Sequence, residues 1–244
     1  MKIGASTLAN KNEKINLNFY EDLGLKYVEL LHQFPNENID TKSNNLKYSI
    51  HSPFLDINIA SLNETIRKAS VNDIINSMDF ASKINAEIVV VHPGIIPFIA
   101  KGLENKIYEK SIKSMKELKL YSDETGVEIA IENMPNIEVF IYQNINDLNN
   151  ILEELELAMT LDIGHANTLN YAPNEMYFPS IKHIHMSDNF ADDDNHLAFG
   201  EGSIDLKACV NIFEEQKYKG IYMIEVNDEF SVKKSYEYFK NKII

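Results

Sequence analysis

Residues 87–92 read Glu87-Ile88-Val89-Val90-Val91-His92, a short apolar run rich in β-branched side chains that ends on a histidine. A run that is apolar at successive positions is typical of a strand buried on both faces, as in a parallel sheet. Residues 220–226, Gly220-Ile221-Tyr222-Met223-Ile224-Glu225-Val226, repeat the pattern with a glutamate near the end. Both stretches therefore predict buried strands of a parallel sheet, each with an ionisable side chain near its carboxyl end.

Strand-like runs of this kind alternate with segments of helical periodicity, in which apolar residues recur three and four positions apart, as at Ile74, Met78 and Ala81. Gly24 and Gly126 lie where helices should end, just before the next strand. We expect strands at residues 2–6, 26–30, 46–51, 87–92, 127–132, 157–162, 181–186 and 220–226. Eight strands alternating with helices, with no glycine-rich phosphate fingerprint after the first, favour a closed (β/α)₈ TIM barrel over an open doubly wound sheet.

The length and composition agree with one α/β domain spanning residues 1–244. TIM barrels commonly contain about 250 residues, and this chain has 244, of which 44% are hydrophobic and 25% charged. No proline- or serine-rich linker, repeat or low-complexity block divides it. We therefore expect a single TIM-barrel domain with a sizeable core.

The charge balance and the cysteine count exclude several classes of protein. The 23 Lys and Arg residues against 37 Asp and Glu give a net charge of −14, so there is no basic footprint for nucleic acid or anionic lipid. Arg67 is the one arginine. Cys209 is the one cysteine, which excludes a disulfide framework, and its apolar helical neighbours predict that it is buried. With no signal-peptide core and no stretch long enough to span a bilayer, we expect a cytoplasmic protein without a membrane partner.

Six of the expected strands end on, or within one residue of, a side chain that can bind a metal. These residues are His51, His92, Glu132, Asp162, His185 and Glu225. In a barrel the carboxyl ends of the strands form one rim, where active sites lie. Each residue alone is readily explained as a satisfied polar group or a solvated strand end, but chance accounts poorly for six in the same position. Mixed carboxylate and imidazole ligands suit Zn²⁺, Mn²⁺ or Co²⁺ better than Ca²⁺ or Mg²⁺.

Further ligand candidates lie in the loops that follow these strands. His165 comes three residues after Asp162, and Asp194 and His196 lie in the acidic loop after the seventh strand. That acidic stretch is equally well explained as a solvated charged loop. His183 precedes His185 by two residues and so shares its face of the strand, and we interpret it as a structural residue.

Together these motifs resemble those of the xylose isomerase-like TIM-barrel superfamily, which contains sugar-phosphate isomerases and epimerases as well as apurinic endonucleases of the endonuclease IV type. In chain order the motifs are His51-Ser52-Pro53-Phe54, His92-Pro93-Gly94, Glu132-Asn133, Asp162-Ile163-Gly164-His165, His185-Met186-Ser187-Asp188, His196 with Gly200-Glu201-Gly202, and Ile224-Glu225. The resemblance covers nearly the whole chain. It is specific to the superfamily and much less specific for one activity.

The isomerase and epimerase branch implies one divalent metal, zinc or manganese, held by Glu132, Asp162, His185 and Glu225. The resemblance also implies that the two glutamates act as acid and base on a bound sugar, sugar phosphate or related compound, while the metal stabilises an enediolate.

The expected partner in this branch is a small carbohydrate, and a homodimer is left open. Substrate binding is expected from His51, His92 and His165. Lys101 or the backbone amides near Gly202 could bind a phosphate group, although a plain turn and helix cap explains Gly202 equally well.

The endonuclease branch implies nine ligands for three zinc ions, and all nine positions are filled in this sequence. The three ligand sets are His51, His92 and Glu132; Glu132, Asp162, His185 and Glu225; and His165, Asp194 and His196. Three departures weigh against this branch. The first strand ends at Gly4-Ala5-Ser6 without an expected histidine, the chain is shorter, and it has one arginine and no tryptophan.

The preferred interpretation is therefore a metal-dependent isomerase or epimerase with one to three ions per chain. A zinc phosphodiesterase is the main alternative, and nucleic acid is the less expected partner. A lyase or dehydratase on the same metal rim, or a metal-binding barrel without turnover, are further alternatives.

Overall fold

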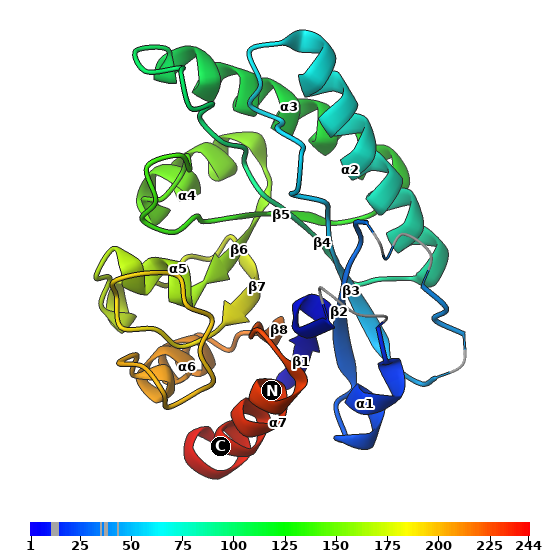
Figure 1. Ribbon diagram of the computed structural model, residues 1–244, viewed down its shortest axis with the longest axis vertical. Coiled ribbons are helices and arrows are strands. Elements are labelled where there is room, and N and C mark those ends of the chain that lie inside the picture. Colours follow the sequence, from blue (N-terminus) through cyan, green and yellow to red (C-terminus); the bar gives the residue numbers. More distant parts are fainter. Residues whose placement is uncertain (11–14, 35, 37–38, 43) are drawn as a thin grey trace.

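A computed structural model describes residues 1–10, 15–34, 36, 39–42 and 44–244. Eight strands form a closed barrel in chain order, and every neighbouring pair is parallel, including β1 with β8 (Figure 1). The strands are β1 (Lys2–Ser6), β2 (Tyr27–Leu31), β3 (Lys47–His51), β4 (Val89–Val91), β5 (Ile129–Glu132), β6 (Ala158–Asp162), β7 (Ile181–Met186) and β8 (Ile221–Ile224). The predicted TIM-barrel fold is confirmed, with each strand within three residues of its expected bounds.

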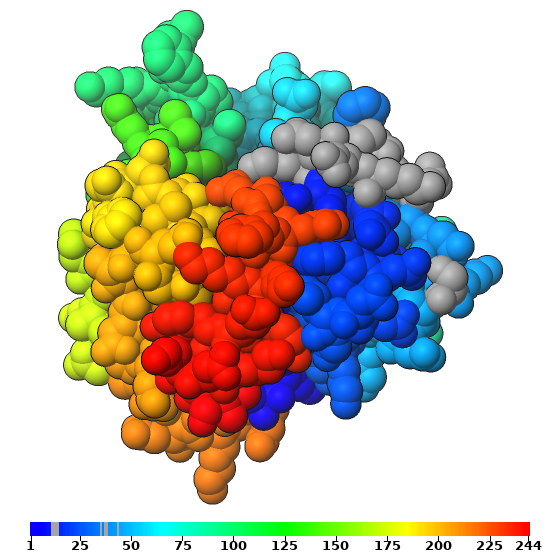
Figure 2. All heavy atoms as spheres, turned by 60° about the horizontal axis from the view of Figure 1, so that its bottom comes forward, coloured from blue at the N-terminus to red at the C-terminus, as the bar shows by residue number. Residues whose placement is uncertain are grey.

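Helices surround the barrel on its outer side (Figure 1). The α-helices are α1 (Leu17–Asp22), α2 (Glu64–Ile84), α3 (Glu104–Thr125), α4 (Ile145–Leu155), α5 (Ile163–Thr168), α6 (Leu206–Glu215) and α7 (Glu229–Tyr238). Short turns of other helix types are η1 (Thr7–Asn10), η2 (Pro173–Glu175) and η3 (Phe239–Ile243). The N-terminal and C-terminal segments lie side by side on one face (Figure 2), as the pairing of β1 with β8 requires.

The helix ends follow local rules that the sequence carries. The side chain of Asn63 accepts a hydrogen bond from the backbone N–H of Thr65 at the start of α2. At the carboxyl end of α3, Gly126 has φ 75°, and its N–H donates to the carbonyl of Ser122. Glycine adopts this left-handed conformation without strain because it carries no Cβ. Gly126 therefore ends the helix, as its position in the sequence predicted.

The core lies between the barrel and its helices. Val89, Val90 and Val91 of β4 are fully buried, as a strand covered on both faces requires. The stripe Ile74, Met78 and Ala81 of α2 packs against this core. Cys209 on α6 is also buried, as predicted. Within the described part of the chain, no helix is both long and apolar enough to cross a membrane.

Candidate functional site

The six predicted strand-end residues meet at one rim of the barrel. His51, Glu132 and Asp162 are the last residues of β3, β5 and β6, and His185 is the penultimate residue of β7. His92 and Glu225 directly follow β4 and β8. Since the strands are parallel, their carboxyl ends converge and the six side chains face one region. The rim that the sequence predicted is therefore formed, with His92 as its most exposed member.

Three carboxylates surround one imidazole nitrogen at the centre of this rim. The Nδ1 atom of His185 lies 2.9 Å from Oε1 of Glu132, 3.2 Å from Oε2 of Glu225 and 4.0 Å from Oδ2 of Asp162. One ligand atom from each of the four residues lies within 4.8 Å of all the others. This central group is the one-metal ligand set that the resemblance implied, and it has the donor types of a divalent transition-metal site.

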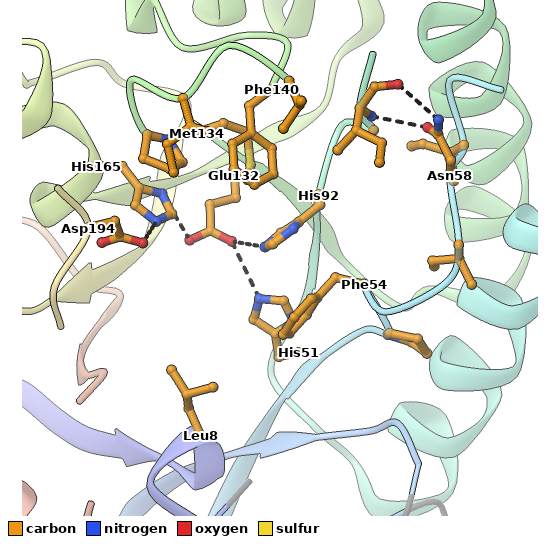
Figure 3. A pocket seen from close by; sticks show the side chains of 18 of the residues that line it. Leu8, His51, Phe54, Asn58, His92, Glu132, Met134, Phe140, His165 and Asp194 are labelled. Carbon is orange, nitrogen blue, oxygen red and sulfur yellow. Dashed lines mark hydrogen bonds and ion pairs between the residues drawn. The ribbon is translucent and has the colours of Figure 1, made fainter. Parts of the chain in front are cut away.

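A second group shares Glu132. The Oε2 atom of Glu132 lies 3.1 Å from Nε2 of His92 and 3.4 Å from Nε2 of His51. Figure 3 marks both contacts with dashed lines. The ring of Phe54 stacks on His92 and meets His51 edge-on, so both imidazoles are packed as well as paired. Glu132 therefore lies between the central group and this second group.

A third group lies on the other side of the rim, where Oδ2 of Asp194 is 3.1 Å from Nε2 of both His165 and His196. In each of the three proposed ligand sets, the ligand atoms lie within 4.8 Å of one another. The acidic loop after β7 is therefore tied to the site through Asp194, whereas its neighbour Asp193 is exposed.

Backbone carbonyls orient three of these imidazoles. The Nδ1 atoms of His51, His165 and His196 lie 2.7–3.0 Å from the carbonyl oxygens of Ser52, Asn133 and Glu225 respectively. A carbonyl oxygen only accepts, so each Nδ1 carries a proton and a neutral ring presents a bare Nε2 to the site. This is the arrangement that metal-binding histidines require.

His185 is oriented the other way, by a residue that sequence reasoning missed. Oε1 of Glu29 lies 2.9 Å from Nε2 of His185, and its Oε2 lies 2.8 Å from Nε2 of His183 and accepts a hydrogen bond from Ser49. All of these side chains are buried inside the barrel. A carboxylate beside Nε2 favours a proton there, which leaves Nδ1 of His185 to face the central group.

Glu29 was missed because it lies in the middle of β2 and not at its end. Its signal was a lone charged residue inside the apolar run Tyr27–Leu31, where an unpaired carboxylate would be costly. Glu29, His183 and His185 also form a fourth set of ligand atoms within 4.8 Å. His183 lies deeper than the rim, as its position two residues before His185 indicated.

The carboxylates and imidazoles of the rim perturb one another strongly. Burial raises the pKa of Asp162 to about 7, and the charges of Glu132 and Glu225 add to that rise. Burial opposes the protonated form of His185, but Glu225, Glu29 and Glu132 still hold its pKa well above the usual range. Without a metal, protons thus balance the buried negative charge, and a divalent cation would replace them.

The donor set fits a bound cation. Oδ2 of Asp162 and Oδ1 of Asp194 are buried and have no hydrogen-bond partner among the described residues. Such atoms are costly unless something satisfies them, and both belong to proposed ligand sets. Two unmet carboxylate oxygens beside inward-facing imidazoles are what a divalent metal would satisfy.

A cavity of about 420 Å³ opens over the rim. One side is formed by the ionisable groups, including Glu132, His165 and Glu225. The lining also includes a set of apolar side chains, here called the apolar wall, which are Phe54, Ile57, Ile95, Met134, Val139 and Phe140. Figure 3 shows Phe54, Met134 and Phe140 around the carboxylate of Glu132. The volume is in the range of small-molecule sites.

Two predicted substrate-binding residues lie elsewhere. Lys101 is exposed in the turn before α3 and is absent from the cavity lining. Gly202 packs against Asp188, whose carboxylate accepts hydrogen bonds from the backbone N–H groups of Gly200 and Ile204. Those amides are therefore occupied by a side chain of the protein, and the plain-turn interpretation describes Gly202 better than a phosphate site.

Comparison with known proteins agrees with this geometry. The chain is 36% identical over 243 residues to an uncharacterized protein of Methanocaldococcus jannaschii, covering 94% of this chain and 93% of that one. It is 25% identical over 206 residues to a probable endonuclease 4 of Aquifex aeolicus, covering 74% and 70%.

Among solved structures, a D-tagatose 3-epimerase-like protein superposes with a TM-score of 0.90 at 29% identity, covering 98% of this chain and 96% of that one. The family model described as xylose isomerase-like TIM barrel matches residues 17–242. The chain belongs to the xylose isomerase-like TIM-barrel family.

Proposed function

We propose that this protein is a metal-dependent isomerase or epimerase of a small sugar or a related hydroxy-carbonyl compound. The observation that carries the proposal is the pair Glu132 and Glu225, which reach the central group from β5 and from the end of β8 and both line the cavity. Their Oε atoms both approach Nδ1 of His185. Two carboxylates at one site can divide the work of proton removal and proton return.

The metal would be held by Glu132, Asp162, His185 and Glu225, which supply the unmet oxygen of Asp162 and the inward-facing Nδ1 of His185. When bound, a divalent cation would polarise the substrate carbonyl and offset negative charge that develops beside it. Zinc and manganese both suit three carboxylates and one imidazole.

The protein side chains would carry out the proton transfer. One of the two glutamates removes the proton from the carbon next to the carbonyl, and the other returns a proton to that carbon from the opposite face, or to its neighbour. Glu29 keeps His185 oriented during this exchange, and the apolar wall limits access of water to the reacting carbon. His51, His92 and His165 line the same cavity and would orient substrate hydroxyls.

The test is exchange of the substrate proton with solvent. Protein stripped with EDTA and reloaded with Mn²⁺, Co²⁺ or Zn²⁺ is incubated with D-tagatose, D-psicose, D-fructose and related ketoses in D₂O, and deuterium uptake is followed by NMR. We expect metal-dependent exchange that Glu132→Gln and Glu225→Gln both abolish. Exchange by both variants at the normal rate would contradict the proposal.

A zinc phosphodiesterase is the second candidate, and the observation that favours it is the presence of the second and third ligand groups around Glu132 and Asp194. Three metal ions at such a site would activate a water for attack on a phosphodiester. Incubation with a duplex carrying one abasic site tests this directly. Clean incision together with about three zinc ions per chain would replace the isomerase proposal.

A barrel that binds its metal without turnover is the remaining outcome. It would show metal uptake, neither exchange nor incision, and ligand binding that survives Glu132→Gln.

A further inference from the structure

The apolar wall lines the same cavity as the metal-ligand candidates and contacts some of them, since Phe54 packs on His51 and His92. We propose that the substrate carries an apolar substituent in place of a phosphate group, and that this substituent packs against the wall while its carbonyl end lies at Glu132 and Glu225. The inference rests on the proposed function, because it assumes that the reacting atoms lie at the central group. It adds the chemical class of the rest of the substrate.

The wall is preformed, because three loops are fastened to one another. The side chain of Asn58, in the loop after β3, donates to the carbonyl of Ile95 at 2.9 Å and accepts from the N–H of Ile95 at 3.1 Å. Figure 3 marks both bonds as dashed lines at Asn58. Ile95 in turn forms a β-bridge with Phe140 in the loop after β5. Gly94 has φ 109°, and a Cβ there would lie 2.6 Å from Ala60, so the loops also pack closely.

Five of the six wall side chains stay partly exposed, and only Met134 is buried. Ile95 and Val139 are 36% and 37% exposed, and Phe54, Ile57 and Phe140 are partly exposed. When an apolar group covers the apolar surface of a preformed cavity, water leaves that surface and the free energy of the system falls. The wall therefore favours a ligand that places carbon, and not water, against these side chains.

The apolar wall offers little to a phosphate or a polyol chain. Among the described residues that line the cavity there is no lysine or arginine, while Asp193 and Asp194 add negative charge on the ionisable side. Asn58 is the one uncharged amide or hydroxyl side chain in that lining, and its oxygen and nitrogen are already bonded to Ile95, with Ala60 N–H also donating to the oxygen. Phosphate and hydroxyl groups placed against the wall would thus lose hydrogen bonds to water without replacement.

The test uses hydroxamates, which bind divalent metals through two oxygens and carry a variable tail. Protein loaded with Co²⁺ is titrated with acetohydroxamate, hexanohydroxamate and phosphoglycolohydroxamate by calorimetry. Each buried methylene is worth about fourfold in affinity, so we expect the four extra methylenes of the hexanoyl probe to tighten binding at least tenfold. The phosphate-bearing probe should bind no more tightly than acetohydroxamate.

Two variants locate the effect. Ile95→Asn and Val139→Asn, both at partly exposed positions, should reduce the gain from the hexanoyl tail to below threefold and leave acetohydroxamate affinity unchanged. Leu120→Asn is the matched control, because Leu120 is 65% exposed on α3 and is not among the cavity-lining residues. It should keep the full gain. Circular dichroism spectra confirm that each variant is folded.

The outcomes separate the two proposals. Equal affinity for the acetyl and hexanoyl probes, or a phosphate probe that binds tenfold more tightly than acetohydroxamate, would overturn the inference about the substrate and leave the proposed metal chemistry standing. Failure of Co²⁺-loaded protein to bind acetohydroxamate at all would overturn the proposed function and this inference with it.

Discussion

Two dense groups of charged residues lie in this protein, and they are built differently. In the group between α2 and α3, Arg67 is fully buried and donates hydrogen bonds to Glu64, Glu117 and Ser114. These five bonds use all five N–H groups of its guanidinium. The buried cation of this group therefore has carboxylate partners of opposite sign within the protein.

The rim group has no lysine or arginine to balance it. Its carboxylates face imidazoles, and Oδ2 of Asp162 and Oδ1 of Asp194 are buried with no hydrogen-bond partner among the described residues. A high density of charge is thus not what distinguishes a functional site. The distinguishing feature is buried acceptors with no partner among the described residues, which a bound cation would satisfy.

The largest effect should come from the same substitution made in each group. Glu132→Gln removes a carboxylate shared by two ligand sets, and we expect metal-dependent proton exchange to fall at least about a thousandfold. Glu117→Gln, in the α2–α3 group, should leave the exchange rate within twofold. Deuterium exchange measured on both variants at saturating metal makes the comparison, and equal rates would remove the distinction between the two groups.

The second effect concerns the residue beneath the rim. Glu29→Gln should weaken metal binding by about 10- to 100-fold, because an amide no longer places a negative charge beside Nε2 of His185. Ser49→Ala is the control, since it removes one hydrogen bond to Glu29 and keeps the carboxylate. Competition with a chromophoric chelator measures the affinities. An unchanged affinity in Glu29→Gln would show that Glu29 serves folding alone.

The third effect is on stability and belongs to the α2–α3 group. Arg67→Met keeps much of the buried volume but removes all five hydrogen bonds, and we expect a loss of about 2 kcal/mol in the free energy of unfolding. Urea denaturation measures it. Metal affinity should not change. If Arg67→Met instead abolished metal binding, the two groups would be coupled and the contrast between them would fail.

The smallest effect is the dependence of metal affinity on pH. Burial raises the pKa of Asp162 to about 7, and its protonated form competes with a metal, so this carboxyl alone should lower the affinity about tenfold from pH 8 to pH 6. In the metal-free protein the folded state keeps a proton that the unfolded state has lost, so this carboxyl's contribution to stability falls as pH rises through 7.

In the group between α2 and α3, by contrast, the carboxylate of Glu64 does not change its protonation state in this pH range. Hydrogen bonds from Arg67, Lys113 and Lys110 hold the pKa of Glu64 well below its usual range, so Glu64 stays ionised between pH 6 and pH 8. Calorimetric metal titrations in two buffers of different ionisation enthalpy count the protons released. Metal binding that releases no proton and is independent of pH would contradict the account of Asp162.

Much of the site followed from the sequence because each predicted ligand occupies the same place on its strand. His51, Glu132 and Asp162 end strands that periodicity identifies, and parallel strands bring their carboxyl ends together. Lys101 was assigned to a phosphate site from its charge alone, and charge does not fix the direction in which a loop points. Gly202 was assigned from a turn motif, yet its neighbouring amides bond Asp188.

The sequence by itself determined the barrel and the set of candidate ligands at its rim, because both depend on local periodicity and on the end of each strand. Only the tertiary structure decided what lies beneath that rim and which loops surround it. Glu29 reaches His185 across 156 residues of chain, and the apolar wall joins loops after β3, β4 and β5 through Asn58 and Ile95. Contacts between distant segments depend on how strands tilt and loops pack, and no local pattern records them.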